Sequence, residues 1–167
     1  MTFNNKTVLI TGGARGFGKA IAVAFLESGA ETIVIDSNEN NIEDFRKKYN
    51  ENNSKVKLIT MDITKSKSTV NILNSLCDSY KGIDILINNA RSGIRTNPLE
   101  ESEDNFDTTV AVMLKAPLFM SQYLIKKNYK INKNQSTTII NISSILGQYV
   151  SNESASYHLV KSAFEGL

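Results

Sequence analysis

The stretch Thr11-Gly12-Gly13-Ala14-Arg15-Gly16-Phe17-Gly18 separates an apolar run, residues 6–11, from a helical pattern that begins at Gly16. Glycines at such a turn let the backbone reverse tightly and approach a ligand without Cβ atoms in the way. The helix that follows aims its first N–H groups and its positive dipole end at the turn, which favours a pyrophosphate. The spacing is Gly-x3-Gly-x-Gly rather than the commoner Gly-x-Gly-x-x-Gly, and ordinary strand-to-helix junctions also use glycine, so this turn alone is a weak signal.

Apolar runs and helical patterns alternate along the rest of the chain. We predict strands over the five apolar runs at 6–11, 31–36, 55–61, 83–87 and 137–142. Helical patterns fill the intervals at 16–28, 39–50, 65–80 and 103–128, and another helix begins near Ser154. Pro117 falls inside the fourth pattern, where we expect it to bend the helix rather than end it. This alternation predicts an α/β fold, a Rossmann-like doubly wound parallel sheet in three α/β/α layers.

Composition limits the partners that we expect. The 167 residues are 41% hydrophobic, which is enough for one domain over residues 1–167, and 19 basic against 17 acidic residues give a net charge of +2. Basic residues occur only in short groups, so we expect no nucleic-acid partner and no membrane partner. No apolar run approaches the length that spans a bilayer. The single cysteine, Cys77, and an N-terminus without an apolar leader favour a cytoplasmic location.

Polar residues follow the predicted strands at the places where each strand ends. Besides the glycine turn they are Asp36, Asp62, Asn88-Asn89-Ala90 and Ser143-Ser144. Ligands bind at the carboxyl ends of the strands in open α/β sheets, near the point where strand order reverses. The pattern therefore predicts a small-molecule site at this edge of the sheet.

These residues together resemble the short-chain dehydrogenase/reductase family, in its ordinary single-domain branch. The resemblance is carried by the glycine turn, Asp62-Ile63, Asn88-Asn89-Ala90, Asn141-Ile142-Ser143-Ser144 and Tyr157-His158-Leu159-Val160-Lys161, in the family's order. The family's Tyr-x3-Lys signature occurs at Tyr123, Tyr129 and Tyr157, but only Tyr157 has a serine, Ser144, thirteen residues before it at a strand end. The resemblance implies a Rossmann domain that binds NAD(P), and it implies no metal site.

By resemblance, Ser144, Tyr157 and Lys161 form the catalytic set. Tyr157 and Lys161 lie at i and i+4, on one face of a helix. A phenol with an ordinary pKa of about 10 is a poor acid-base group at neutral pH, and a nearby ammonium lowers that pKa. The resemblance implies that Tyr157 exchanges a proton with the substrate oxygen, Lys161 also holds the nicotinamide ribose, and Ser144 hydrogen-bonds the substrate. A surface helix with an incidental Tyr and Lys is the alternative, and we expect His158 to be an incidental helix residue.

The resemblance also assigns a set of residues to the cofactor: Thr11, Gly12, Arg15, Gly16, Phe17, Gly18, Asp36, Asp62, Ile63, Asn89, Ala90, Tyr157 and Lys161. Asp36 can accept hydrogen bonds from both adenosine ribose hydroxyls and would repel a 2′-phosphate, which favours NAD. Arg15 points the other way, because the family shows a basic residue in this turn with NADP. We therefore expect NAD, with NADP less favoured. Asp62 would bind the adenine amino group, or else only cap a helix before Thr64.

Three features depart from the family pattern. By resemblance, Met113 stands where the family has a catalytic asparagine, whose backbone holds a water that relays protons to the lysine and whose side chain stabilises a helix kink. A thioether offers almost no hydrogen bonding. Arg91 replaces the glycine that usually follows Asn-Asn-Ala. The chain also ends at Leu167, before the family's C-terminal strands, so we expect the N-terminal part of a longer protein or a chain whose tail was lost.

Two classes of function remain open on the sequence. The first is an NAD(P)-dependent oxidoreductase that transfers hydride between the nicotinamide and a secondary alcohol or ketone. The second is a dinucleotide-binding protein without efficient catalysis, such as a regulatory or assembly subunit, or an inactive fragment of an enzyme. The family pairs its fourth and fifth helices across subunits, so we expect a homodimer or homotetramer.

Overall fold

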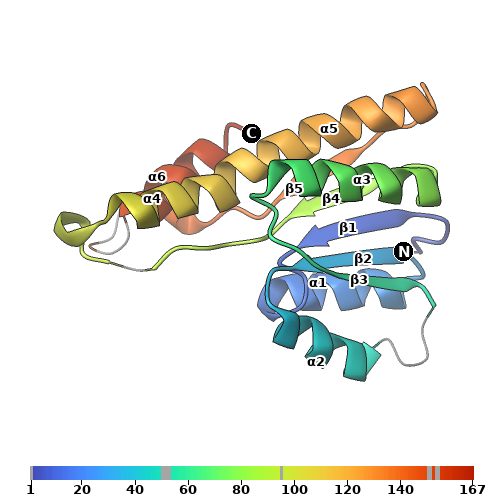
Figure 1. Ribbon diagram of the computed structural model, residues 1–167, viewed down its shortest axis with the longest axis horizontal. Coiled ribbons are helices and arrows are strands. Elements are labelled where there is room, and N and C mark those ends of the chain that lie inside the picture. Colours follow the sequence, from blue (N-terminus) through green and yellow to red (C-terminus); the bar gives the residue numbers. More distant parts are fainter. Residues whose placement is uncertain (1, 50–53, 95, 150–151, 153–154) are drawn as a thin grey trace.

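A computed structural model describes residues 2–49, 54–94, 96–149, 152 and 155–167. Five strands form one parallel sheet in the order β3-β2-β1-β4-β5 (Figure 1). The strands are β1 (Thr7–Thr11), β2 (Glu31–Asp36), β3 (Val56–Thr60), β4 (Ile85–Asn88) and β5 (Thr138–Asn141). Each lies within two residues of a predicted strand, so the predicted doubly wound parallel sheet is confirmed.

Helices cover both faces of this sheet. They are α1 (Gly16–Glu27), α2 (Glu39–Tyr49), α3 (Ser66–Tyr80), α4 (Glu103–Val110), α5 (Ala116–Ile131) and α6 (Ala155–Phe164). In Figure 1, α1 and α2 lie on one face and α3 and α5 on the other, while α4 and α6 extend beyond the end of the sheet. Ser154, where we predicted the last helix to begin, lies outside the described residues.

The central strands have side chains buried on both faces, which explains their unbroken apolar runs. In β1, Val8 and Ile10 pack with Ala22 and Leu26 of α1, whereas Leu9 packs into the core on the opposite face with α3 and α5. All five residues of β1 are buried. Because β2 and β4 flank β1 on either side, the chain reverses its direction across the sheet between β1 and β4. The carboxyl ends of these strands therefore lie beside one another.

The predicted helix over 103–128 is divided by a π-helical turn, η2 (Ala111–Lys115), between α4 and α5. Pro117, in the first turn of α5, has no N–H group to donate to the Met113 carbonyl four residues earlier. Within the turn, the Ala116 N–H bonds instead to the Ala111 carbonyl, five residues back. The helical run continues to Ile131, so the prediction that Pro117 does not end the helix is confirmed.

The same helical run corrects one expectation drawn from the sequence. Glu103–Ile131 is 29 residues long with a mean hydropathy of 1.2, which by length and composition is enough to cross a membrane. Some of its apolar residues serve the core, where Met120 and Leu124 pack with Leu73 of α3 against the sheet, whereas Phe119 and Ile125 are exposed. A core helix of a globular protein has the same length and composition, so this run by itself is weak evidence for a membrane span.

Candidate active site

A cavity of about 800 Å³ opens at the carboxyl edge of the sheet. That volume is in the range of sites that bind cofactors and other small molecules. Every residue that the sequence assigned to the site, except Thr11, lines this cavity: Gly12, Arg15, Gly16, Phe17, Gly18, Asp36, Asp62, Ile63, Asn89, Ala90, Ser144, Tyr157 and Lys161. The fold thus brings the predicted cofactor residues of the strand ends and the predicted catalytic residues Ser144, Tyr157 and Lys161 together around one cavity.

The glycine turn is held by contacts that only glycine allows. Gly12 and Gly16 have φ values of +62° and +54°, in the left-handed region. A Cβ atom on Gly18 would lie 2.2 Å from the Gly12 carbonyl oxygen. The Asn89 side chain fills the remaining space and donates hydrogen bonds to the carbonyls of Thr11 at 3.0 Å and Gly12 at 2.9 Å. The start of α1 is therefore drawn close to the turn, as a pyrophosphate site requires.

Thr11 supports the turn from behind rather than lining the cavity. Its side chain is buried, and its hydroxyl accepts hydrogen bonds from the backbone N–H groups of Asn89 and Ala90, both at 3.1 Å. The same hydroxyl donates to the Ile87 carbonyl at 3.4 Å. Thr11 and Asn89 together fasten the end of β1 to the end of β4.

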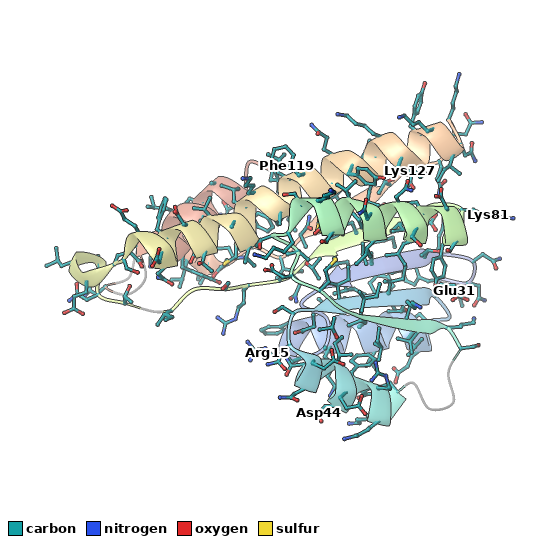
Figure 2. All side chains as sticks on the ribbon, viewed as in Figure 1. Arg15, Glu31, Asp44, Lys81, Phe119 and Lys127 are labelled. Atoms are coloured by element: carbon teal, nitrogen blue, oxygen red, sulfur yellow. The ribbon has the colours of Figure 1, made fainter. Side chains whose placement is uncertain are left out.

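Asp36 joins the glycine turn to the loop after β2. One carboxylate oxygen accepts from the Ala14 N–H at 3.3 Å, and the other accepts from the Asn38 N–H at 3.0 Å and the Asn41 amide at 3.3 Å. The residue is buried but lines the cavity. Arg15, exposed at the start of α1, lies near the same edge of the sheet (Figure 2). Asp36 and Arg15 thus line the same part of the cavity wall.

Asp62 makes a local turn with Thr64. One of its oxygens accepts from the Thr64 N–H at 2.9 Å and from the Thr64 hydroxyl at 2.7 Å. Both Asp62 and Ile63 also line the cavity. The N-cap of α3 is Lys65, without a side-chain cap bond, so Asp62 makes a local turn and not the helix cap that was the alternative. The contact between Asp62 and a cofactor stays a prediction.

Lys161 is buried beneath Tyr157 on α6. Its Nζ donates to the Ile142 carbonyl at 2.5 Å and lies 5.8 Å from the centroid of the Tyr157 ring. Burial, with a further contribution from the Arg91 charge, lowers the pKa of Lys161 from 10.5 to about 8. The ammonium is therefore mostly protonated at neutral pH.

Ser144 begins the short 3₁₀ turn η3 (Ile145–Gly147), which the sequence did not predict. Its hydroxyl accepts from the Leu146 N–H at 3.2 Å, and Ser144 lines the cavity with Tyr157. His158 Nδ1 lies 2.9 Å from the Leu146 carbonyl, and the Ser162 hydroxyl donates to the Gly147 carbonyl at 2.6 Å. Expected to be incidental, His158 is instead a buried contact between η3 and α6.

The other two Tyr-x3-Lys pairs lie away from the cavity. Tyr123 donates to the Asn74 side chain at 3.2 Å, and Lys127 forms an ion pair with Asp78 at 2.7 Å. Figure 2 shows Lys127 above α3, toward the end of α5 that is remote from the carboxyl edge. Tyr129 is exposed on α5. Of the three Tyr-x3-Lys pairs, only Tyr157 and Lys161, the pair selected from its position after Ser144, line the cavity.

Met113 is fully buried inside the π-helical turn. The helix therefore departs from regular α geometry at the position where the family has its asparagine, although no amide is present to stabilise that departure. Asn88, next to the predicted cofactor residues, is also buried, and its amide donates to the side chains of Ser121 at 3.3 Å and Asn141 at 2.9 Å. These bonds connect β4 to α5 and β5.

Several cavity-lining residues were not predicted to belong to the site. They follow the ends of β2 and β5, lie in the first turn of α2 or come from the π-helical turn: Ser37, Asn38, Asn41, Val112 and Ile142. Their positions directly after strands are a signal that sequence could supply for most of them. Val112 lies inside a predicted regular helix, so only the packed structure identifies it.

Comparisons with known proteins agree with this geometry. The sequence profile described as short chain dehydrogenase matches residues 6–167. The chain belongs to the short-chain dehydrogenase family. It is 35% identical over 144 residues to a short chain dehydrogenase/reductase of Gibberella zeae, an alignment that covers 86% of this chain and 53% of that protein.

Two further similarities cover nearly the whole chain. An uncharacterized oxidoreductase of Thermotoga maritima is 32% identical over 167 residues, which is 100% of this chain and 64% of that protein. The fold matches that of an NAD⁺-bound xylitol dehydrogenase with a TM-score of 0.89 at 22% identity, over 99% of this chain and 63% of that structure. This short-chain dehydrogenase chain thus spans between about half and two thirds of the length of these relatives.

Proposed function

We propose that this protein is an NAD(P)-dependent oxidoreductase that transfers hydride between the nicotinamide and a secondary alcohol or ketone. The observation that supports this most is the shared cavity, which has the glycine turn and Asp36 on one part of its wall and Ser144, Tyr157 and Lys161 on another. Membership of the short-chain dehydrogenase family supports the same class of reaction. The bound nicotinamide would supply or accept the hydride.

The residues at the cavity suit the proton side of this reaction. In ketone reduction, as hydride reaches the carbonyl carbon, Tyr157 gives its phenolic proton to the carbonyl oxygen, and the C=O π bond becomes an O–H bond. The Lys161 ammonium stabilises the phenolate left behind. The Ser144 hydroxyl donates a hydrogen bond to the same substrate oxygen and polarises the carbonyl. Alcohol oxidation reverses each step.

The residues around the glycine turn fit a dinucleotide. The space that a Cβ on Gly18 would fill lets the start of α1 approach the turn, where its N–H groups can hold a pyrophosphate. Asp36, at the end of β2, favours a free ribose 2′-hydroxyl over a 2′-phosphate. We therefore propose NAD as the preferred cofactor, although Arg15 at the same edge would suit a phosphate.

Replacing Tyr157 tests this function. We expect Tyr157→Phe to lower NADH-dependent reduction of a panel of small ketones by about 10²- to 10⁴-fold, because the proton donor is lost. NADH affinity, measured by fluorescence titration, is expected to stay the same. Tyr123→Phe is a matched control, since Tyr123 carries the same signature away from the cavity. A Tyr157→Phe variant as active as the unmodified protein would contradict the assignment.

Met113 favours a second candidate, a dinucleotide-binding protein without efficient catalysis. Its buried thioether cannot make the hydrogen bonds by which an asparagine side chain would stabilise the kink and the relay water beside it. If only this relay is missing, Met113→Asn raises the rate of ketone reduction while NADH affinity stays constant. Tight NADH binding with no turnover in either the unmodified protein or the Met113→Asn variant would favour the second candidate.

A further inference from the structure

The helix that carries Tyr157 receives a carboxylate from a distant segment at its first turn. Glu101, just before α4, accepts a hydrogen bond from the backbone N–H of Ser156 at 3.2 Å, although the two residues are 55 positions apart. The first N–H groups of a helix have no partner within the helix. A carboxylate at this end also interacts favourably with the helix dipole.

Glu101 is itself held in place by Asn105, in the first turns of α4. The Asn105 amide donates to Glu101 Oε1, and it also donates to the Ile94 carbonyl at 3.2 Å. The side-chain oxygen of Asn105, Oδ1, accepts from the Ile94 N–H at 2.8 Å. Hydrogen bonds from Ser156 and Asn105 lower the pKa of Glu101. The ionised carboxylate thus connects the loop after β4 to the start of α6.

The two ends of α6 are attached differently. Toward its C-terminal end, Lys161 donates to the Ile142 carbonyl and Ser162 to the Gly147 carbonyl. This end of α6 is therefore attached to η3 and to the residue that follows β5. In the first turn, Ser156 is attached to Glu101, just before α4, and His158, directly after Tyr157, contacts the Leu146 carbonyl of η3. Tyr157 lies between these attachments, directly after Ser156. A shift of the first turn would therefore move the phenol relative to Lys161.

The loop that Glu101 helps to hold also borders Tyr157. A recess of about 20 Å³ beside the main cavity is lined by Arg91, Gly93, Thr109, Ser156 and Tyr157. Arg91 lines both spaces. The same network of hydrogen bonds thus holds one wall of the space next to the phenol and the helix that presents it.

We propose that Glu101 is a positioning residue for Tyr157. By accepting the Ser156 N–H while held by Asn105, it fixes the first turn of α6 against the loop after β4, and so fixes the phenol relative to Ser144 and Lys161. This role rests on the proposed function, in which Tyr157 transfers the proton. Because it leaves the glycine turn and Asp36 untouched, we expect cofactor affinity to change much less than kcat.

Glu101→Ala is expected to lower kcat for NADH-dependent reduction of the best ketone of the panel by about 10- to 100-fold, since a displaced catalytic group costs that much. Glu101→Gln is expected to lose much less, because its amide oxygen can still accept the Ser156 N–H. NADH affinity should change much less than kcat in both variants. Glu100→Ala is the matched control, since Glu100 is the neighbouring exposed carboxylate and should leave kcat unchanged.

The outcomes separate this role from the function on which it rests. Equal kcat in Glu101→Ala and the unmodified protein contradicts the positioning role and leaves the proposed function intact. Equal losses of kcat and NADH affinity in Glu101→Ala contradict it as well, since they indicate general damage to the fold. A Glu101→Gln variant as slow as Glu101→Ala rules out the hydrogen bond as the cause. An unmodified protein that reduces no ketone contradicts the proposed function, and the positioning role with it.

Discussion

The two parts of the cavity wall are built by different means. Around the glycine turn, β1 and β4 are buried along their whole lengths, and close backbone approaches at glycine set the geometry. Around Tyr157, β5 alternates between exposed and half-buried residues, and hydrogen bonds that involve side chains attach α6 to η3 and to Glu101, just before α4. Substitutions in the first part should therefore damage folding and cofactor binding together, whereas substitutions in the second should change turnover selectively.

The largest effect that this comparison predicts is that of Gly18→Ala. Within a helix, alanine is ordinarily more favourable than glycine by about 1 kcal/mol. Here its Cβ would lie 2.2 Å from the Gly12 carbonyl oxygen, so backbone must move. We expect a loss of stability of about 1–3 kcal/mol and no measurable NADH binding, by denaturant unfolding and fluorescence titration.

Gly16→Ala is the matched control in the same turn. A Cβ on Gly16 meets nothing within 4 Å, so its cost is only that of the positive φ, about 1–2 kcal/mol. NADH binding should survive in this variant. If Gly18→Ala bound NADH as well as Gly16→Ala does, the close approach of α1 to the turn would not be what forms the site.

Asp36→Ala should have the next largest effect, on the choice of cofactor. Removing the carboxylate deletes a charged hydrogen-bond acceptor for the ribose, so NADH affinity should fall relative to NADPH affinity by about 10-fold or more. Parallel titrations with the two cofactors measure this ratio. Because Asp36 also holds Ala14 and Asn38, Asp36→Asn serves as a second variant that keeps an acceptor. Asp62→Ala, in the same cavity, should leave the ratio unchanged; an unchanged ratio in Asp36→Ala would make Asp36 a structural residue only.

The smallest effect concerns the pH dependence set by Lys161. Its pKa is lowered to about 8, so the ammonium is charged below that pH and neutral above it. We expect kcat/KM to fall as pH rises through about 8, because the charge that stabilises the Tyr157 phenolate disappears. Lys161→Arg should lack this decline, since a guanidinium stays protonated. Arg91→Ala should move the decline to higher pH, because the Arg91 charge lowers the pKa of Lys161. If the pH profile is unchanged in both variants, the decline belongs to the titration of another group.

Sequence patterns were sufficient for most of the fold because they act over short distances. Unbroken apolar runs such as Val8 to Ile10 are what strands buried on both faces require, and they located the central strands. The runs at the more exposed strands β3 and β5 were also found. The position of the cavity was also predicted, because the polar residues that line it directly follow the strands in the sequence. The π-helical turn was missed because it arises from Pro117 removing one hydrogen bond within an otherwise regular pattern.

The amino-acid sequence alone determined the parallel sheet, the glycine turn and the residue types that face the cavity, because periodicity, glycine and chain order express them locally. Tertiary structure alone decided that Thr11 supports the turn from behind, that burial lowers the pKa of Lys161, and that Glu101 meets the helix of Tyr157. Each of these depends on contacts between segments 55 or more residues apart, or on exclusion of water by the packed chain, and neither leaves a pattern in neighbouring residues.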